Sequence, residues 1–187
     1  MCGKFTQGFD LSYLTALLKL PPTSARPAGS ATPGRTALAL RSGVGQIMAS
    51  TLRWGFASAP GLGVRPIINA RAETMADKPM FASACRQARC ALPVSAYLEG
   101  NTRLDLPDIP LFYLAGLFQN GADGMAEFCV ITREATPALA SIHPRMPLVL
   151  HDRVTLKGWL DAGVQPEQPP RLAVNPFDDA PRQLAMF

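Results

Sequence analysis

The sequence predicts an α+β fold in which a curled, mainly antiparallel and barrel-like β-sheet is flanked by short helices. Glycine and proline are abundant, with 15 and 18 of the 187 residues, which favours many turns between short strands over a helical bundle. Apolar residues make up 48% and charged residues 17%, a composition that argues against disorder. This length is typical of one domain, which we expect to span residues 1–187.

Helix signals occur in four places along the chain. Residues 10–19 and 152–161 each begin with an aspartate that can act as the N-cap. In the first of these segments, four leucines recur on one helical face. Residues 72–83 are expected to form a short helix, and residues 136–140 one helical turn.

Strand signals are short apolar segments bounded by turn residues. Residues 21–36 contain four prolines and two glycines, so we expect an extended connection there. The expected strands are 37–41, 46–53, 66–69, 90–94, 111–118, 127–132 and 171–175.

The chain shows neither a membrane-spanning run nor a secretory leader. No apolar run reaches the length of about 18 residues that a membrane span needs, and MCGKFTQGFD has no apolar core of a signal peptide. We therefore expect a cytosolic protein. In that compartment the cysteines are expected to be reduced thiols; they are Cys2, Cys85, Cys90 and Cys129.

Positive charge is concentrated in the first part of the chain. Residues 1–72 contain eight basic side chains and one acidic one, whereas the remainder contains ten basic and thirteen acidic side chains. This asymmetry points to an anionic partner, of which nucleic acid is the commonest. The alternative is that these arginines are solvated loop residues without a partner.

Several common sites are missing from the sequence. There is no dinucleotide-binding glycine motif and no phosphate-binding loop of the Walker type. A zinc site fits poorly, because Cys85 and Cys90 are separated by four residues and only two histidines exist. We therefore expect no cofactor and no metal.

Cys2 is the first candidate for chemistry, because removal of Met1 would make it the first residue. Its α-amine would then have a pKa of about 8, so part of it is neutral near pH 7. A neutral amine attacks an aldehyde to form an imine, and the neighbouring thiol can close a five-membered thiazolidine ring. The alternative is that a cysteine at this position is incidental.

Three further residues suit positioning and proton transfer. Asn69 follows the apolar pair Ile67–Ile68 and can orient a terminal amine or a substrate oxygen with its amide, unless it is a turn residue. Glu99 ends an apolar segment, which suits a carboxyl group with a raised pKa, unless it is an exposed loop carboxylate. His143 lies among prolines that fix its direction, unless it is an ordinary loop histidine.

Arginines and one tryptophan complete the set of candidates. Arg71 can hold a phosphate with its planar guanidinium group, and otherwise is a surface arginine. Trp54 stands beside Arg53, and a tryptophan in a basic region can stack on a base. Its alternative is a place in the core, where most tryptophans are largely buried.

Five motifs occur in one order: MCGKFT, LRWGF, NARAET, CALPVSAYLEG and IHPRMP. This series resembles the SRAP family (SOS-response-associated peptidase domain), whose members shield abasic sites in single-stranded DNA. The resemblance covers the chain from residue 1 to about residue 175. It implies a curled, mainly antiparallel sheet, flanking helices and a positively charged channel for DNA, and with it a cytosolic protein associated with the nucleoid.

The resemblance also implies roles for individual residues. Cys2 would crosslink to the opened sugar, Asn69 would place the amine and the sugar, and Glu99 and His143 would transfer protons. The implied contacts to DNA are Lys4, Arg53, Trp54, Arg71 and Arg145. The chain departs from the family pattern at Gly100, where an aromatic residue is usual, and at Ala82, where arginine is frequent.

Three functions remain open at this point. The favoured one is a monomeric protein that binds single-stranded DNA and crosslinks to abasic sites through Cys2. The second is a thiol peptidase in which Cys2 and His143 attack a peptide bond, that of its own Met1 being one candidate. The third is a protein that binds single-stranded DNA without forming a crosslink.

Overall fold

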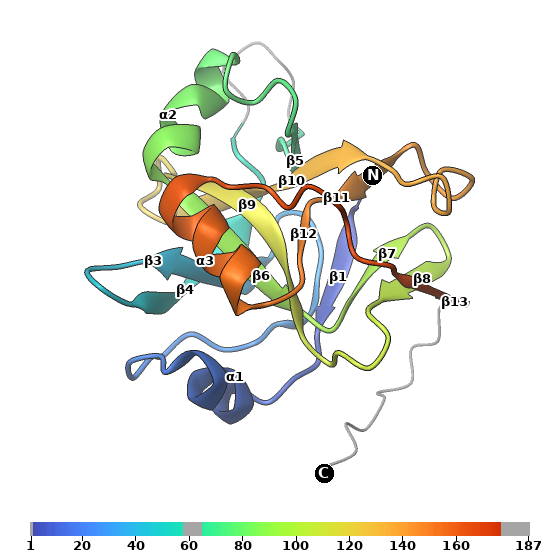
Figure 1. The fold of residues 1–187 in the computed structure, drawn as a ribbon. Helices are drawn as coiled ribbons and strands as arrows, with labels where there is room; N and C mark the ends of the chain where they lie inside the picture. Colours follow the sequence, from blue (N-terminus) through green and yellow to red (C-terminus); the bar gives the residue numbers. More distant parts are fainter. Residues whose placement is uncertain (1, 58–64, 177–187) are drawn as a thin grey trace.

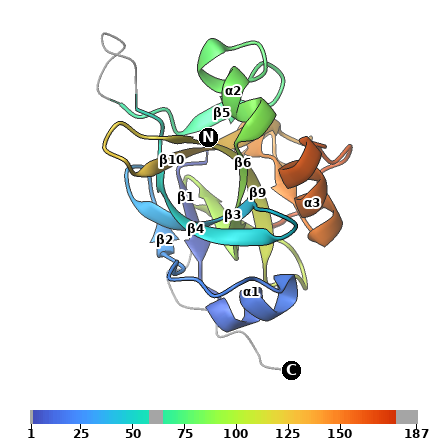
Figure 2. The same cartoon turned by 90° about the vertical axis from the view of Figure 1, so that its left-hand side faces the viewer.

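A computed structural model describes residues 2–57 and 65–176 of the chain (Figure 1). Within these residues, three short helices surround two β-sheets. The helices are α1 (Leu11–Leu18), α2 (Pro79–Gln87) and α3 (Arg153–Ala162). Figures 1 and 2 agree in placing α1 and α2 at opposite ends of the molecule. The expected α+β class with a curled, mainly antiparallel sheet is confirmed.

The smaller sheet holds the beginning of the chain. Its strands are antiparallel and lie in the order β13 (Ala173–Pro176), β8 (Thr102–Asp105), β7 (Ala96–Glu99), β1 (Lys4–Gln7) and β2 (Gly29–Ala31). β1 therefore pairs on both sides, which fixes the backbone immediately after Cys2. Lys4 lies opposite Leu98 near the end of β7, and Cys2 precedes β1 by two residues.

The larger sheet is strongly curled. Its order is β11 (Arg145–Pro147), β10 (Ala126–Glu134), β4 (Ile47–Trp54), β3 (Thr36–Ser42), β6 (Arg89–Val94), β9 (Phe112–Asn120) and β12 (Val149–Leu150), with β5 (Asn69–Arg71) on β10. Strand β10 is parallel to β4 and β5 and also pairs antiparallel with β9. The curl brings β5, β10 and β11 together, and these strands carry three of the candidate residues.

Two apolar clusters fill the molecule. One lies under the helices and includes Leu14, Phe81 and Trp159. The other contains Cys2 together with a group of aromatic rings. In it, the ring of Trp54 lies 4.8 Å from that of Phe5 and stacks at 5.7 Å on that of Phe128, centroid to centroid. The candidate nucleophile is thus attached to a rigid core.

The helix ends follow the capping signals of the sequence. The Asp10 side chain accepts a hydrogen bond from the Ser12 N–H, and Asp152 forms a capping box with Thr155. The helix predicted over 72–83 is wrong in its bounds, since residues 72–77 form turns and α2 begins at Pro79. Proline has no N–H to donate, so it fits the first turn of a helix and not its interior.

Several strands were not predicted because they are short or polar. They include β1, β7 and β8, and also β2, which lies within the expected extended connection 21–36. The strand predicted over 66–69 is shifted, because Ile67 forms an isolated bridge with Phe56 and β5 begins at Asn69.

A buried amide joins the two sheets at Gln7, the last residue of β1. The side-chain Nε2 donates to the carbonyl oxygens of Leu38 (2.8 Å) and Pro93 (3.0 Å). Its Oε1 accepts from the N–H groups of Ala28 (3.0 Å) and Leu38 (3.1 Å). The register that pairs Leu40 with Ala91 brings Pro93 opposite Leu38, and proline cannot donate the next ladder bond. The Gln7 amide therefore replaces the backbone hydrogen bonds that are missing between β3 and β6 at this position.

Candidate active site at the start of strand β1

Cys2 is fully buried, and its backbone is held by a side chain from the other sheet. The Asn69 Nδ2 donates to the Cys2 carbonyl oxygen at 3.2 Å, and the Cys2 Sγ lies 3.7 Å from the Lys4 carbonyl oxygen. Burial, with a further contribution from the Glu99 carboxylate, raises the pKa of the Cys2 thiol to about 12. The sulfur is therefore a neutral thiol near pH 7. Met1 lies outside the described residues.

Asn69 presents both ends of its amide to the site. It begins β5, which pairs in parallel with β10 and places Asn69 beside Val130. While Nδ2 holds the Cys2 carbonyl, the Oδ1 atom is buried and has no hydrogen-bond partner among the described residues. A buried acceptor without a donor is costly, so Asn69 is ready to accept a hydrogen bond from an incoming group.

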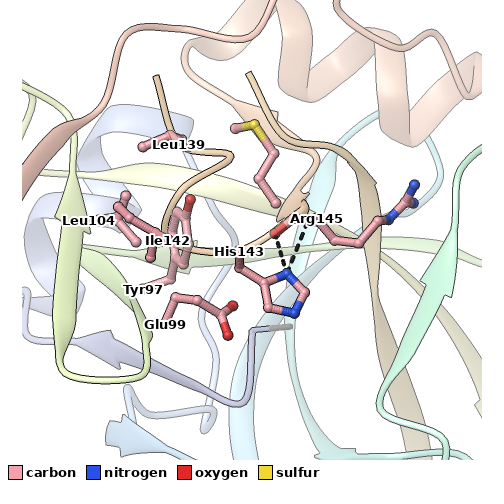
Figure 3. A pocket seen from close by; sticks show the side chains of 8 residues that line it. Tyr97, Glu99, Leu104, Leu139, Ile142, His143 and Arg145 are labelled. Atoms are coloured by element: carbon pink, nitrogen blue, oxygen red, sulfur yellow. Dashed lines mark hydrogen bonds between the residues drawn. The ribbon is translucent and has the colours of Figure 1, made fainter. Parts of the chain in front are cut away.

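A small pocket is lined by Glu99, the residue whose carboxylate acts on the Cys2 thiol (Figure 3). The lining residues are Tyr97, Glu99, Leu104, Leu139, Ile142, His143, Arg145 and Met146. Figure 3 shows the Glu99 carboxylate and the His143 ring side by side in this pocket, with the Arg145 side chain running away from them.

The His143 ring is oriented by its own loop. Its Nδ1 lies 2.9 Å from the Arg145 N and 3.1 Å from the Arg145 carbonyl oxygen. Because a backbone N–H can only donate, Nδ1 accepts in the neutral ring and the ring proton is on Nε2. The predicted turn 136–140 precedes it, with the Ala140 N–H bonded to the Thr136 carbonyl.

Arg145 lines the pocket, and its guanidinium group is paired with a carboxylate of the protein. Its Nη1 and Nη2 donate to the two carboxylate oxygens of Glu73 at 2.9 and 2.8 Å, and Nη2 also donates to the Thr132 carbonyl at 2.6 Å. This bond from Arg145 lowers the pKa of Glu73 to about 2. The predicted phosphate contact is thus half of an ion pair. Sequence reasoning gave no role to Glu73, although it lies in the NARAET motif.

Two other predicted cations lie near the site. Arg71 ends β5, two residues after Asn69, is exposed, and forms no ion pair among the described residues. Lys4 is half-buried in β1 and follows Cys2 by two residues. Their roles toward DNA stay predictions.

The side chains of two predicted DNA contacts form hydrogen bonds to other groups of the protein. Trp54 is fully buried and its Nε1 donates to the Ile68 carbonyl at 3.0 Å, so the core alternative is correct and stacking on a base is not. Arg53 binds the carboxylates of Asp123 and Glu127. These bonds raise the pKa of Arg53 above its usual range and pair its charge with two carboxylates, so a contact of Arg53 with DNA stays a prediction.

Among the described residues, no group of three or more histidine, cysteine, aspartate or glutamate side chains has the arrangement of a metal site. Within residues 2–57 and 65–176, no helix has both the length and the apolar character needed to cross a membrane.

Comparison with other proteins identifies close structural neighbours. A structure from Bordetella bronchiseptica has a TM-score of 0.77 at 21% identity and covers 95% of this chain and 100% of its own. A structure from Bacteroides thetaiotaomicron also has a TM-score of 0.77, at 16% identity, with 97% of each chain covered. At these identities the likeness shows the fold.

Relatives in sequence cover most of the chain. The abasic site processing protein YobE of Bacillus subtilis is 29% identical over 182 residues, which are 86% of this chain and 82% of the relative. The abasic site processing protein YedK of Escherichia coli is 26% identical over 196 residues, covering 94% and 86%. The family model described as SOS response associated peptidase (SRAP) matches residues 1–186. The resemblance seen in the five motifs is thereby confirmed, and the chain belongs to the SRAP family.

Proposed function

We propose that this protein processes abasic sites in single-stranded DNA by forming a covalent crosslink through Cys2 after removal of Met1. The observation that carries the proposal is the position of Cys2: Asn69 holds its carbonyl, and its thiol feels the charge of Glu99, which lines a pocket together with His143. The names of the relatives, abasic site processing proteins, support the choice of substrate. We propose that the chain acts as a single-domain monomer.

The chemistry uses both nucleophiles of an N-terminal cysteine. The ring-opened sugar of an abasic site offers an aldehyde, and the neutral α-amine adds to its carbon. Loss of one water gives an imine. The Cys2 S–H then adds across the C=N bond, with sulfur joining carbon and the proton ending on nitrogen, which closes a thiazolidine. No oxidant or reductant is needed.

The remaining residues have roles in this sequence. Asn69 would hold the Cys2 backbone and accept a hydrogen bond from the amine or a sugar hydroxyl through Oδ1, which has no other donor among the described residues. Glu99 and His143 would carry protons during ring opening and loss of water. Arg71, exposed at the end of β5, is the cation best placed to contact a phosphate without breaking an ion pair.

The raised pKa of Cys2 favours this route over thiol peptidase chemistry. A cysteine peptidase needs a thiolate activated by a neighbouring histidine. Here the thiol is buried with a pKa of about 12, and its hydrogen bond goes to the Lys4 carbonyl. A neutral S–H that adds second, after the amine, is compatible with that environment.

The test is adduct formation with an oligonucleotide that contains one abasic site. Wild-type protein should give a heat-stable adduct, and Cys2→Ala should give none. The Cys2→Ala protein keeps an α-amine once Met1 is removed, so it should still form an imine that borohydride can trap. An uncleavable N-terminal tag should abolish both products. Cys85→Ala, a thiol outside the site, is the matched control and should behave as wild type.

Two outcomes would favour the alternatives. Turnover of peptides without a DNA adduct would favour the peptidase. Salt-dependent binding of single-stranded DNA without any adduct would favour a binding protein without chemistry. A heat-stable adduct in Cys2→Ala would exclude the thiazolidine.

A further inference from the structure

Glu73 forms an ion pair with Arg145 that joins two separate segments of the site. It lies in the turns that follow β5, and both its carboxylate oxygens accept hydrogen bonds from Arg145, at 2.9 and 2.8 Å. This two-bond arrangement fixes the plane of the guanidinium group as well as its position. The Arg145 side chain is largely buried, with 16% exposed.

The Arg145 backbone connects this ion pair to His143, which lines the pocket. It is the first residue of β11, a three-residue strand at the edge of the larger sheet. Its backbone N–H donates to the His143 Nδ1 at 2.9 Å. Short edge strands pair on one side only and fray at their ends, so side-chain bonds to the first residue matter there.

Two further hydrogen bonds from the same guanidinium group strengthen the connection. Arg145 Nη2 also donates to the carbonyl and the hydroxyl oxygens of Thr132, at 2.6 and 3.3 Å. Thr132 lies on β10 opposite Arg71 of β5. The segment that carries Asn69 and the segment that carries His143 are therefore joined through one arginine.

We propose that Glu73 is a positioning residue for His143: it fixes Arg145, whose backbone N–H holds the imidazole in the Nε2–H form. The carboxylate stays ionised at neutral pH, because Arg145 keeps the pKa of Glu73 near 2. The ion pair between Glu73 and Arg145 is therefore present at neutral pH. This role is separate from any contact of Arg145 with DNA.

The direct test is nitrogen NMR of the histidine rings in the protein without DNA. The chain has two histidines, so His151 is an internal reference in every spectrum. In wild-type protein, the neutral His143 ring should show a protonated Nε2 and an unprotonated Nδ1, with the Nε2–H form in about tenfold excess. Glu73→Gln should move both nitrogen signals toward a mixture of the two forms and leave His151 unchanged.

Three variants complete the test. Glu134→Gln removes a neighbouring exposed carboxylate on β10 and should leave His143 as in wild type. Glu73→Asp should restore part of the wild-type signal. Arg145→Lys keeps the charge and the backbone donor but loses the two-bond arrangement, so it should match Glu73→Gln. An unchanged Nε2–H population in both Glu73→Gln and Arg145→Lys would overturn the proposal.

A kinetic test rests on the proposed function. Glu73→Gln should slow adduct formation about tenfold at saturating abasic DNA, and should have no further effect in a His143→Ala background. A slower rate caused by weaker DNA binding alone, with the saturated rate unchanged, would contradict positioning of His143. Since the NMR test uses no DNA, failure of adduct formation in wild-type protein would leave it fully decisive.

Discussion

Replacement of Gln7 by leucine should destabilise the protein strongly, although the two side chains are similar in size. Gln7 is 1% exposed and makes four hydrogen bonds to the backbone. Leucine would leave two carbonyl and two N–H groups without partners in a region where β3 and β6 separate at Pro93. The backbone of Pro93 cannot donate to the Leu38 carbonyl in place of Gln7, because proline has no N–H.

The magnitude follows from these four bonds. Each buried hydrogen bond contributes about 0.5–1.5 kcal/mol, and a buried polar group left without a partner costs about 1–3 kcal/mol. Allowing for the favourable burial of leucine, about 3–5 kcal/mol should be lost. This is a large part of a stability that is typically about 5–15 kcal/mol.

Urea unfolding followed by tryptophan fluorescence measures this loss, since Trp54 and Trp159 are both fully buried. The matched control is Gln87→Leu, an exposed glutamine at the end of α2, which should change stability by less than about 0.5 kcal/mol. If the free energy of unfolding of Gln7→Leu lies within about 1 kcal/mol of the wild-type value, the claim that this amide replaces backbone hydrogen bonds between β3 and β6 is refuted.

Three further predictions concern the core, a helix cap and an ion pair. Trp54→Ala should lose about 3–5 kcal/mol in urea unfolding, whereas a surface residue that stacks on DNA would cost little. Asp152→Ala removes the capping box of α3 and should lower stability by about 1 kcal/mol in the same assay. The folded-state pKa of Glu73 is lowered from 4.5 to about 2, so its ion pair stabilises the fold above pH 4.5 and this contribution is lost as pH falls toward 2. The stability difference between wild type and Glu73→Gln should therefore shrink over that range, and a difference that stays constant would contradict the ion pair.

The sequence predicted best those features that depend on local chemistry. The caps at Asp10 and Asp152 were identified because a short side-chain acceptor before an apolar helix satisfies free N–H groups. The long strands β3, β4, β9 and β10 carry continuous or alternating apolar residues, which mark burial on one or both faces.

Features that depend on distant partners were missed. Strand β1 has the polar sequence KFTQ and becomes a strand because β2 and β7 pair with it on either side. Arg53 resembled a free cation until the curl of the sheet brought it to Asp123 and Glu127, about seventy residues later. Periodicity in one segment carries no information about such pairs.

The candidate site shows the same division. Cys2, Asn69, Glu99 and His143 were selected from the sequence by their chemistry and by the family resemblance, and the structure brings them together. Glu73 could not be selected, because its importance lies in a bond to Arg145, seventy-two residues away in the chain.

The central claim is that the first residue of the mature chain supplies both nitrogen and sulfur to one sugar carbon. The most direct measurement is the intact mass of the protein, before and after incubation with an abasic oligonucleotide, followed by mapping of the modified peptide. We predict a protein without Met1 that gains the oligonucleotide mass less one water, with the attachment at Cys2. A protein that retains Met1 and still forms the adduct, or an adduct on any other residue, would contradict the account.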